Sequence, residues 1–573
     1  MNRLPRVLIV VALFAVTGVA WWATRPLVSS FGIPQGGQLV ASIRAEPRTF
    51  NRFAARDHVT DLVSMLTHGR LVRVNRQTQA LEPWLAERWE VSAADGLTYT
   101  LHLRPGLLWS DGTPFTSADV AFSFAAAYDT TVASVIAGSM KVGSAPLGVT
   151  TPDADTVVLT FPEPFGPGLR LLDNMPILPK HKLQSALDAG TFDKAWTAAT
   201  PPADIVGTGP FVMQEYVPGQ RLVFVRNPHY WRHDDEGRPL PYLDRLVLEI
   251  VTEQNAELLR LQSGQIDMPM SELRAEDYAP IKRAADAGEV TLRDLGVATD
   301  ANAFWFLLNP GTRAKDPRWP FLQRAEFRRA LSYAVDRKAF GESVYLGAAE
   351  PLFGPITPAN TRWYWPGLPK HDYDPARARA LLAGLGLEDR NGNGVVEDER
   401  GIEARFTMIT QKGRTSLERG ATAIRDNAAK VGIAFDVVAL DVNALVERLV
   451  RGDYDAMHFT FSTTNPDPAV NKDFWLSSGS AHVWNIGQKM PATDWERRID
   501  TLMIEQAATL DDGRRHDLFN VVQKIVADEA PILYFSVPRV FVATSRRVVH
   551  VDAAPSAPQL LWSADTIAVA PPR

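Results

Sequence analysis

A loop in the second half of the chain carries the oxygen-bearing side chains of a calcium-binding loop. Its candidate ligands stand at positions 1, 3, 5 and 9 of such a loop: Asp389, Asn391, Asn393 and Glu397. Gly394 stands at position 6, where calcium loops turn sharply, but Arg400 occupies position 12, where a bidentate glutamate belongs. Two hypotheses stay open, a calcium site and a glycine-rich hairpin without metal, and the missing carboxylate favours the hairpin.

No other segment carries the signature of a catalytic or cofactor site. The sequence has no nucleophile elbow, no His-Glu-x-x-His motif, no P-loop and no dinucleotide fingerprint. The run 233–236 (His-Asp-Asp-Glu) offers ligands for a hard metal, but its place in a polar turn favours a solvated loop. We therefore expect a binding protein without a cofactor, unless the 389–400 loop holds calcium.

Two segments repeat one order of elements, which indicates how the binding residues are positioned. A helix at 255–262 is followed by Gly264, Asp267 and a strand, and a helix at 442–451 is followed by Gly452, Asp455 and a strand. Such units build α/β lobes, so the repetition indicates two lobes of similar construction. Composition indicates instead that the Ala- and Pro-rich residues from about Asp552 onward are loosely ordered.

The N-terminus has the layout of an export signal. Arg3 and Arg6 precede an apolar stretch that begins at Val7 and extends to Ala23. Its length, roughly 17 residues, is near the minimum that spans a bilayer, so residues 1–30 are either a cleaved signal peptide or a retained membrane anchor.

Composition narrows the class of protein. The chain has 573 residues and 0 cysteines, which excludes disulfides, thiol chemistry and an N-terminal lipidated cysteine. The net charge of −6 gives no electrostatic footprint for nucleic acid. About 540 residues beyond the leader exceed a single core, so we expect several domains or lobes.

Four blocks of sequence together resemble the extracellular solute-binding proteins of family 5, which include the dipeptide- and oligopeptide-binding components of bacterial ABC importers. The blocks span residues 103–120 (Leu-Arg-Pro-Gly to Asp-Val), 207–211 (Gly-Thr-Gly-Pro-Phe), 226–231 (Arg-Asn-Pro to Tyr-Trp) and 328–337. The resemblance extends from Gly37 to about His550.

The resemblance implies an α/β fold of two lobes, the type II-like, cluster C periplasmic-binding-protein fold, with an extra β-rich domain and a central ligand cleft. It divides the chain into a first lobe made of residues 33–63, 202–297 and 535–573, a β-rich domain of residues 64–201, and a second lobe of residues 298–534. Gly207, Gly209 and Pro210, together with the stretch near residues 531–535, fall where the resemblance places crossings between the lobes, so we expect a hinge there.

The resemblance also implies where a ligand binds. Peptide-binding relatives neutralise the amino terminus of the peptide with an aspartate in a loop that corresponds to residues 461–468. That loop contributes Thr463, Thr464, Asn465 and Asp467 to the candidate site. The register puts the neutral Thr464 at the position of the aspartate. Three alternatives stay open: Asp467 takes this role, the register is wrong, or the ligand lacks a free amino terminus.

Large aromatic side chains and one acid complete the candidate site. The rings are Trp305, Trp363, Trp365 and Trp484, for which core packing is the alternative, and Asp57 is the candidate from the first lobe.

The expected function is that of the substrate-binding component of an ABC importer, which captures a short peptide or related small solute and delivers it to a membrane permease. The protein is expected to be a monomer, in the periplasm or on the outer face of the cytoplasmic membrane. The alternatives are a cell-envelope sensor or enzyme with the same fold, and a receptor for a non-peptide solute such as an oligosaccharide or a metal chelate.

The two hypotheses for the 389–400 loop differ in one measurement. Calcium binding to the folded protein raises its melting temperature in millimolar Ca²⁺, and a chelator reverses the rise. The hairpin, which we expect, leaves the melting temperature unchanged by both treatments. A reversible rise would contradict the hairpin.

Overall fold

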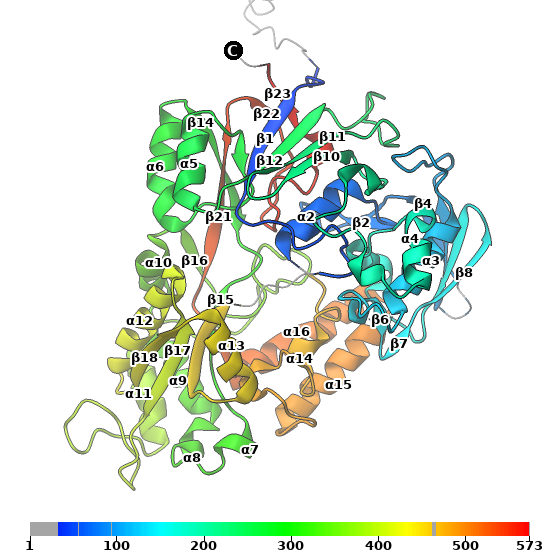
Figure 1. Cartoon of the computed structure of the whole chain (residues 1–573). Helices are drawn as coiled ribbons and strands as arrows, with labels where there is room; N and C mark the ends of the chain where they lie inside the picture. Colours follow the sequence, from blue (N-terminus) through cyan, green and yellow to red (C-terminus); the bar gives the residue numbers. More distant parts are fainter. Residues whose placement is uncertain (1–31, 56, 93, 95, 461–465, 572–573) are drawn as a thin grey trace, which may run out of the picture.

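Two five-stranded sheets, one in each half of the molecule, organise the chain (Figure 1). The computed structural model describes residues 32–571 except residues 56, 93, 95 and 461–465. The leader predicted for residues 1–30 lies outside this range. Within the described part of the chain, no helix is long and apolar enough to cross a membrane.

The first sheet belongs to the first lobe. Its strands, in spatial order, are β10 (Phe211–Val217), β11 (Arg221–Arg226), β12 (Arg245–Ile250), β1 (Gln38–Ile43) and β13 (Met268–Pro269). Strand β1 pairs in parallel with both β12 and β13, and alternate side chains, Leu39, Ala41 and Ile43, are fully buried. The helices of this lobe are α2 (His58–Thr67), α5 (Gln254–Gln262) and α6 (Ala275–Asp286).

The second sheet belongs to the second lobe. Its strands, in spatial order, are β18 (Ala434–Leu440), β17 (Arg405–Gln411), β19 (Ala456–Thr460), β15 (Asn302–Phe306) and β20 (Ile532–Tyr534). Strand β17 pairs in parallel with β18 and β19, whereas β15 is antiparallel to both of its neighbours. The longer helices of this lobe are α9 (Ala325–Ala334), α10 (Arg337–Tyr345), α11 (Pro375–Gly384), α12 (Thr415–Ala429), α13 (Val442–Arg451), α15 (Asp494–Ala508) and α16 (Asp512–Glu529). The short ones are α7 (Pro310–Arg313), α8 (Trp319–Leu322) and α14 (Lys472–Trp475).

Two stretches of chain join the lobes. Strand β14 (Val290–Val297) ends in the first half, and β15 of the second sheet begins at Asn302. On the return, β20 ends at Tyr534, and β21 (Ser536–Ser545) pairs with β14 and with β16 (Ala349–Pro351). Only Phe535, itself buried against Phe340, separates β20 from β21. The expected crossing near residues 531–535 therefore coincides with a connection between the two sheets.

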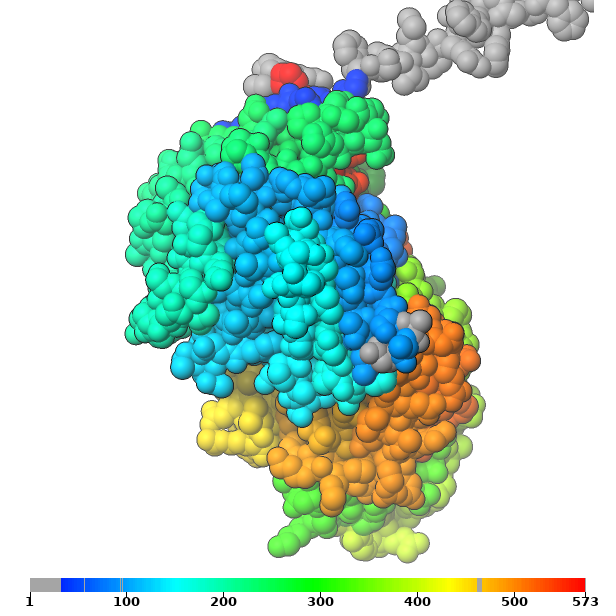
Figure 2. Space-filling model, turned by 90° about the vertical axis from the view of Figure 1, so that its right-hand side faces the viewer, coloured from blue at the N-terminus to red at the C-terminus, as the bar shows by residue number. Residues whose placement is uncertain are grey.

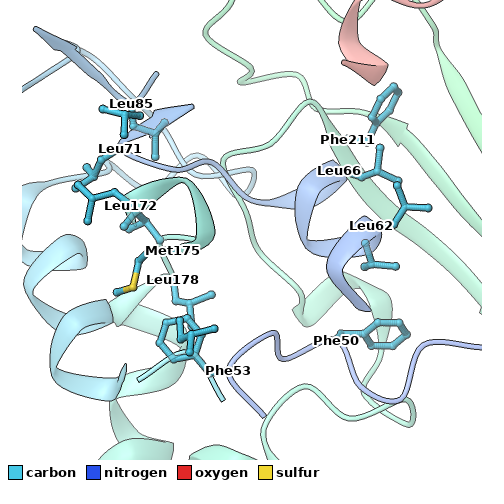
Figure 3. Close-up of a cluster of buried hydrophobic side chains, with 14 of the residues drawn as sticks. Phe50, Phe53, Leu62, Leu66, Leu71, Leu85, Leu172, Met175, Leu178 and Phe211 are labelled. Atoms are coloured by element: carbon cyan, nitrogen blue, oxygen red, sulfur yellow. The ribbon is translucent and has the colours of Figure 1, made fainter. Parts of the chain in front are cut away.

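A β-rich region between residues 64 and 201 packs on the first lobe. Its main sheet contains β4 (Ala86–Val91), β5 (Thr98–Leu103), β9 (Thr156–Thr160) and β8 (Gly148–Asp153), and its helices are α3 (Ser117–Tyr128) and α4 (Lys180–Asp188). Two small hairpins add β2 (Val72–Val74) with β3 (Leu81–Pro83), and β6 (Lys141–Val142) with β7 (Ala145–Pro146). Residues of this region and of the first lobe share one hydrophobic core, part of which Figure 3 shows around Leu66, Phe211, Leu71, Leu172 and Met175.

The repeated helix–glycine–aspartate–strand unit is present in both lobes. Helix α13 ends at Gly452, which has φ +64°, and Asp455 then accepts a hydrogen bond from Thr407 N at the start of the neighbouring parallel strand. In the first lobe Asp267 accepts the equivalent bond from Val40 N of β1. Each aspartate thus fixes the first residues of two parallel strands to each other, which is why the same short sequence recurs.

The expectation of a loosely ordered C-terminus is wrong. Leu560, Leu561, Ile567 and Val569 are buried in the core of the first lobe. The last strand, β23 (Ala568–Val569), pairs with β22 (Val548–His550). Composition misled because these apolar residues are ordered by contacts with segments hundreds of residues earlier in the chain.

Gly207, Gly209 and Pro210 do not lie at a connection between the lobes. They lie where the β-rich region enters β10, against the end of α2, and Gly209 N donates to Thr67 O at 2.9 Å. A Cβ atom on Gly207 would lie 1.8 Å from Thr67 O. These glycines allow a close approach of two backbone segments within one half of the molecule.

Replacing Gly207 tests whether it serves packing or a hinge. Gly207→Ala forces Thr67 and the chain around it apart, so we expect the free energy of unfolding to fall by more than about 3 kcal/mol in chemical denaturation. Gly384→Ala is the control, because a Cβ there meets nothing within 4 Å, and the helix-favouring change adds up to about 1 kcal/mol. A Gly207→Ala variant of unchanged stability but altered solute affinity would contradict the packing role.

Candidate functional site

The carboxyl ends of the parallel strands in the first lobe point toward the second lobe. Strand β21 starts beside the second lobe, at Ser536, and ends at Ser545, whose N donates to Asp267 O just before β13. Leu273, just after β13, donates its N to Phe541 O, nearer the start of β21. Strand β13 therefore runs toward the second lobe, and so does its parallel neighbour β1, as Figure 1 shows.

The parallel strands of the second lobe point back toward the first. Asn302, the first residue after the connection from the first lobe, pairs with Thr460, the last residue of β19. Strand β17 is parallel to β19, so its carboxyl end lies on the same side. Ligands of open α/β sheets bind beyond the carboxyl ends of the strands, and here two such edges face each other. The candidate site therefore lies between the lobes.

A hairpin of the β-rich region reaches the second lobe beside this site. Gln79, at the turn between β2 and β3, is buried and has φ +59°. Its Nε2 donates to Ala359 O at 2.7 Å, and its Oε1 accepts from Thr361 Oγ1 and Arg362 N, both at 3.4 Å. Arg170 donates to the backbone oxygen of Gln79 at 2.8 Å and holds the turn in place. Gln79 thus connects the two halves of the molecule through side-chain hydrogen bonds.

Two further hydrogen bonds extend this junction between the β-rich region and the second lobe. Gly166 N donates to Ala507 O at 2.6 Å, and Lys472 Nζ donates to Gly143 O at 3.2 Å. Figure 2 shows the β-rich region, in blue and cyan, in direct contact with the orange helical part of the second lobe. The β-rich region therefore takes part in holding the lobes together.

Asp467, a candidate for the acid that binds an amino group, already has a cationic partner. Its Oδ1 accepts from Arg515 Nη2 at 2.7 Å, and the side chains are 1% and 0% exposed. Ala469 N also donates to Oδ1, at 3.0 Å. The carboxylate thus compensates the buried guanidinium and shapes the loop, which leaves the role of an amine ligand to another group.

The other residues predicted in the 461–468 loop, Thr463, Thr464 and Asn465, lie outside the described residues. Asp57, the candidate from the first lobe, caps α2. Its Oδ1 accepts from Val59 N and Thr60 N, at 3.1 and 2.9 Å. Asp57 is only partly buried, so capping is the role that its contacts show.

Three of the four predicted tryptophans are packed inside the second lobe. Trp305 is fully buried, and its Nε1 donates to Tyr454 Oη at 3.0 Å. Trp484 is also fully buried, beside His482, and Trp363 stacks on His516 with the ring centres 4.4 Å apart. Trp365 alone keeps an accessible part. Core packing, the alternative considered for each ring, thus describes Trp305, Trp363 and Trp484.

The predicted calcium ligands are hydrogen-bonded within their own loop. Asp389 accepts from the backbone N of Gly392, Asn393 and Gly394, at 2.8 to 3.1 Å. Asn391 and Asn393 accept from backbone N groups two residues later, and Glu397 Oε1 accepts from Arg390 N. Arg400, at the twelfth position, pairs with Asp398. These contacts are those of a hairpin that holds itself together.

Sequence reasoning missed Gln79, Arg170 and Arg515. A glutamine in a hairpin turn gives no local signal, because its role depends on a loop about 280 residues away. Arg515 could not be recognised from the sequence, because it lies on a helix with several other charged residues. It differs from them in the structure by being completely buried.

Comparison with known sequences identifies relatives along most of the chain. Residues 80–482 match the family described as bacterial extracellular solute-binding proteins, family 5. A probable ABC transporter-binding protein of Deinococcus radiodurans is 26% identical over 92% of this chain and 91% of its own length. The heme-binding protein A of Haemophilus influenzae is 30% identical over 82% and 81%, and the oligopeptide-binding protein AppA of Bacillus subtilis is 26% identical over 89% and 88%.

Solved structures share the fold. The ABC transporter substrate-binding protein CtaP of Listeria monocytogenes superposes with a TM-score of 0.76 at 24% identity, covering 93% of this chain and 99% of that one. The periplasmic binding protein MelB of Agrobacterium fabrum, in complex with stachyose, superposes with a TM-score of 0.71 at 21% identity, covering 94% and 86%. Both confirm the two-lobed α/β architecture.

The buried ion pair predicts a stability defect when one partner is removed. Asp467→Asn leaves the buried Arg515 with only the more distant and exposed Asp512, at 3.8 Å, as a carboxylate partner among the described residues, so we expect the free energy of unfolding to fall by about 3 kcal/mol. The double variant Asp467→Leu with Arg515→Met, which removes both charges, should recover most of this loss in the same denaturation experiment. An Asp467→Asn variant of unchanged stability that loses affinity for a solute amine would restore Asp467 as a ligand-binding acid.

Proposed function

This chain belongs to the bacterial extracellular solute-binding proteins of family 5 and is the solute-binding component of an ABC transporter; on that basis we propose that it captures a short peptide between its lobes and delivers it to a membrane permease. The family consists of non-catalytic binding proteins, so the alternative of an envelope enzyme is set aside. The observation that carries the proposal is the pair of sheet edges that face each other between the lobes.

Peptides suit a site built at the carboxyl ends of strands. Main-chain N–H and C=O groups of a binding site can bind the repeating amide groups of a peptide whatever its side chains are. A relative named for oligopeptide binding aligns along most of this chain, which supports the same choice.

A non-peptide solute is the second candidate, and the Asp467–Arg515 pair is the observation that favours it. With Asp467 engaged, a free amino terminus has no assigned carboxylate partner in the 461–468 loop. A buried ammonium without such a partner is costly. Oligosaccharides and metal chelates lack this requirement, and one structural relative was solved with stachyose.

Closure of the lobes over the solute is the proposed binding motion. The two connections, residues 298–301 and Phe535, are short enough to act as hinges, and Gln79 is placed to hold the closed form. A contact made only in the closed form raises the population of that form before the solute binds. The solute then spends less of its binding free energy on closure, so its affinity rises although the contact does not touch it.

The cellular setting and the domain division also remain proposals. Residues 1–30 direct export, and the protein acts as a monomer in the periplasm or on the outer face of the cytoplasmic membrane. We retain the division into residues 33–63, 202–297 and 535–573, a β-rich domain at 64–201, and a second lobe at 298–534.

Native mass spectrometry of freshly purified protein tests the proposed solute. We expect a bound mass that is released on denaturation and fragments as a peptide. A released oligosaccharide or chelate would contradict the peptide and support the second candidate. If nothing co-purifies, calorimetric titration with peptide mixtures applies, and failure to bind any peptide would contradict the proposal.

A Gln79→Ala variant tests the role of closure. We expect it to weaken binding of the identified solute by about tenfold, which corresponds to the loss of roughly one buried hydrogen-bonded contact. Gln184→Ala is the control, since Gln184 is also partly buried in the β-rich region but bonds only to Asp188 on its own helix. Equal affinities of the two variants in isothermal titration would contradict the closure role.

A further inference from the structure

A small cavity lies where the β-rich region meets the first lobe. It is bounded by the end of α2, by the β2–β3 hairpin and by residues 561–565, and its volume is about 30 Å³. That is room for roughly two water molecules or one small ion. Its lining includes His68, Arg70, Arg73, Trp84, Trp562 and Asp565.

Three of the lining side chains have a buried nitrogen without a hydrogen-bond partner among the described residues. They are Arg70 Nε and Trp562 Nε1, which carry N–H groups, and His68 Nε2, whose role depends on the tautomer; Trp562 is 5% exposed. The Arg70 and Trp562 groups are donors only, so whatever satisfies them must accept hydrogen bonds. Asp565, the one carboxylate among the lining residues, already accepts from Tyr230 Oη at 2.8 Å and from Arg232 Nη1 at 2.6 Å.

The charges around the cavity leave one cation uncompensated. Arg52 pairs with Asp61, and Arg73 pairs with Glu82 at 2.8 Å. Asp173 accepts from the backbone N of Val74 and is the remaining acid near Arg70 and Arg76. Arg76 donates to Ala557 O, whereas the guanidinium of Arg70 has no hydrogen bond or ion pair with any described residue. With Arg232 and its partner Asp565 included, five arginines thus face four carboxylates.

The neighbouring groups keep this positive charge in place. Arg73 lies over the ring of Trp84, 3.9 Å from its centre, and 5.0 Å from that of Trp562. Burial and the nearby Arg70 lower the pKa of His68 to about 3, so the imidazole is neutral and adds no charge at physiological pH. An arginine stays protonated throughout that range. The cavity is therefore a fixed, electropositive site lined by free donors.

We propose that this cavity is an anion-binding site, in which Arg70 and Trp562 donate to a chloride-sized anion or to one carboxylate oxygen of a bound molecule. The anion compensates Arg70 and satisfies both unpartnered N–H groups at once. Water would accept these bonds but leave the charge uncompensated. The β2–β3 hairpin that borders the cavity also carries Gln79, so an anion here stabilises the hairpin that holds the second lobe.

The first test uses the full chain with no added solute, so its outcome does not depend on the proposed peptide. Melting temperatures are compared in sodium chloride, bromide, formate and gluconate at equal ionic strength. We expect the three small anions, but not gluconate, to raise the melting temperature by about 2 °C at a hundred times their dissociation constant. Arg70→Gln should abolish this difference. Arg104→Gln is the control that should retain it, because Arg104 is also partly buried but does not line the cavity.

Bromide-soaked crystals keep the test decisive if Arg70→Gln fails to fold. An anomalous peak within about 3.5 Å of Arg70 Nε and Trp562 Nε1 supports the site. A cavity that holds only water, in protein whose melting temperature does not change with the anion, rules out a free anion at this site and leaves only the anionic solute tested next.

A second arm separates a free anion from an anionic group of the solute, and this arm alone rests on the proposed function. The solute supplies the anion if three results are found together. Free anions do not change the melting temperature, Arg70→Gln weakens binding of an anionic solute at least tenfold, and Arg70→Gln does not weaken binding of the neutral amide analogue of that solute. Equal weakening of both solutes overturns the proposal.

Discussion

The pairing of β21 with β14 is the constraint on which the rest of the structure depends. These two strands carry the chain into and out of the second lobe, and each continues into the second sheet after at most a few residues. The second lobe is thus an insertion held at its base by an antiparallel ladder. Because the ladder fixes the direction of β21, it also fixes the direction of β13 and β1, and the carboxyl ends of both sheets face the space between the lobes.

Several polar side chains around that space form hydrogen bonds and ion pairs within the protein. Gln79 and its partners bind one half of the molecule to the other, and Asp467 and Arg515 neutralise each other inside the second lobe. The pairing with Arg515 explains why Asp467 is not available for a ligand. Under the proposed closure, contacts that the solute does not make, those of Gln79 with the second lobe, would raise its affinity.

Local patterns in the sequence predicted the elements that depend on local interactions. Helix α13 was predicted with its bounds because its apolar spacing and the glycine that ends it are encoded within a dozen residues. The repeated aspartate was visible for the same reason. The two-lobed fold came from motif blocks in order, and the comparisons confirm it.

Features that depend on distant contacts could not be predicted in this way. The same aromatic residue fits a core or a cleft, and the complete burial of Trp305 and Trp484 follows from the packing of the whole lobe. Gly207 was expected at a hinge because the family resemblance places a crossing there, but in the structure its missing side chain allows two backbone segments to approach closely. The C-terminal residues have the composition of a loose tail and are ordered only by a core that forms from other segments.

In the proposed binding motion, the two lobes close over a solute about the connections at residues 298–301 and at Phe535. Because the chain has no cysteine, spin labels can be attached to a K141C/R497C variant, which places one label on the β-rich region and one on the second lobe. Pulsed electron–electron double resonance should give a broad distribution of distances between the labels without solute, and a narrower distribution at shorter distances with solute. The same distribution in both conditions would contradict the account.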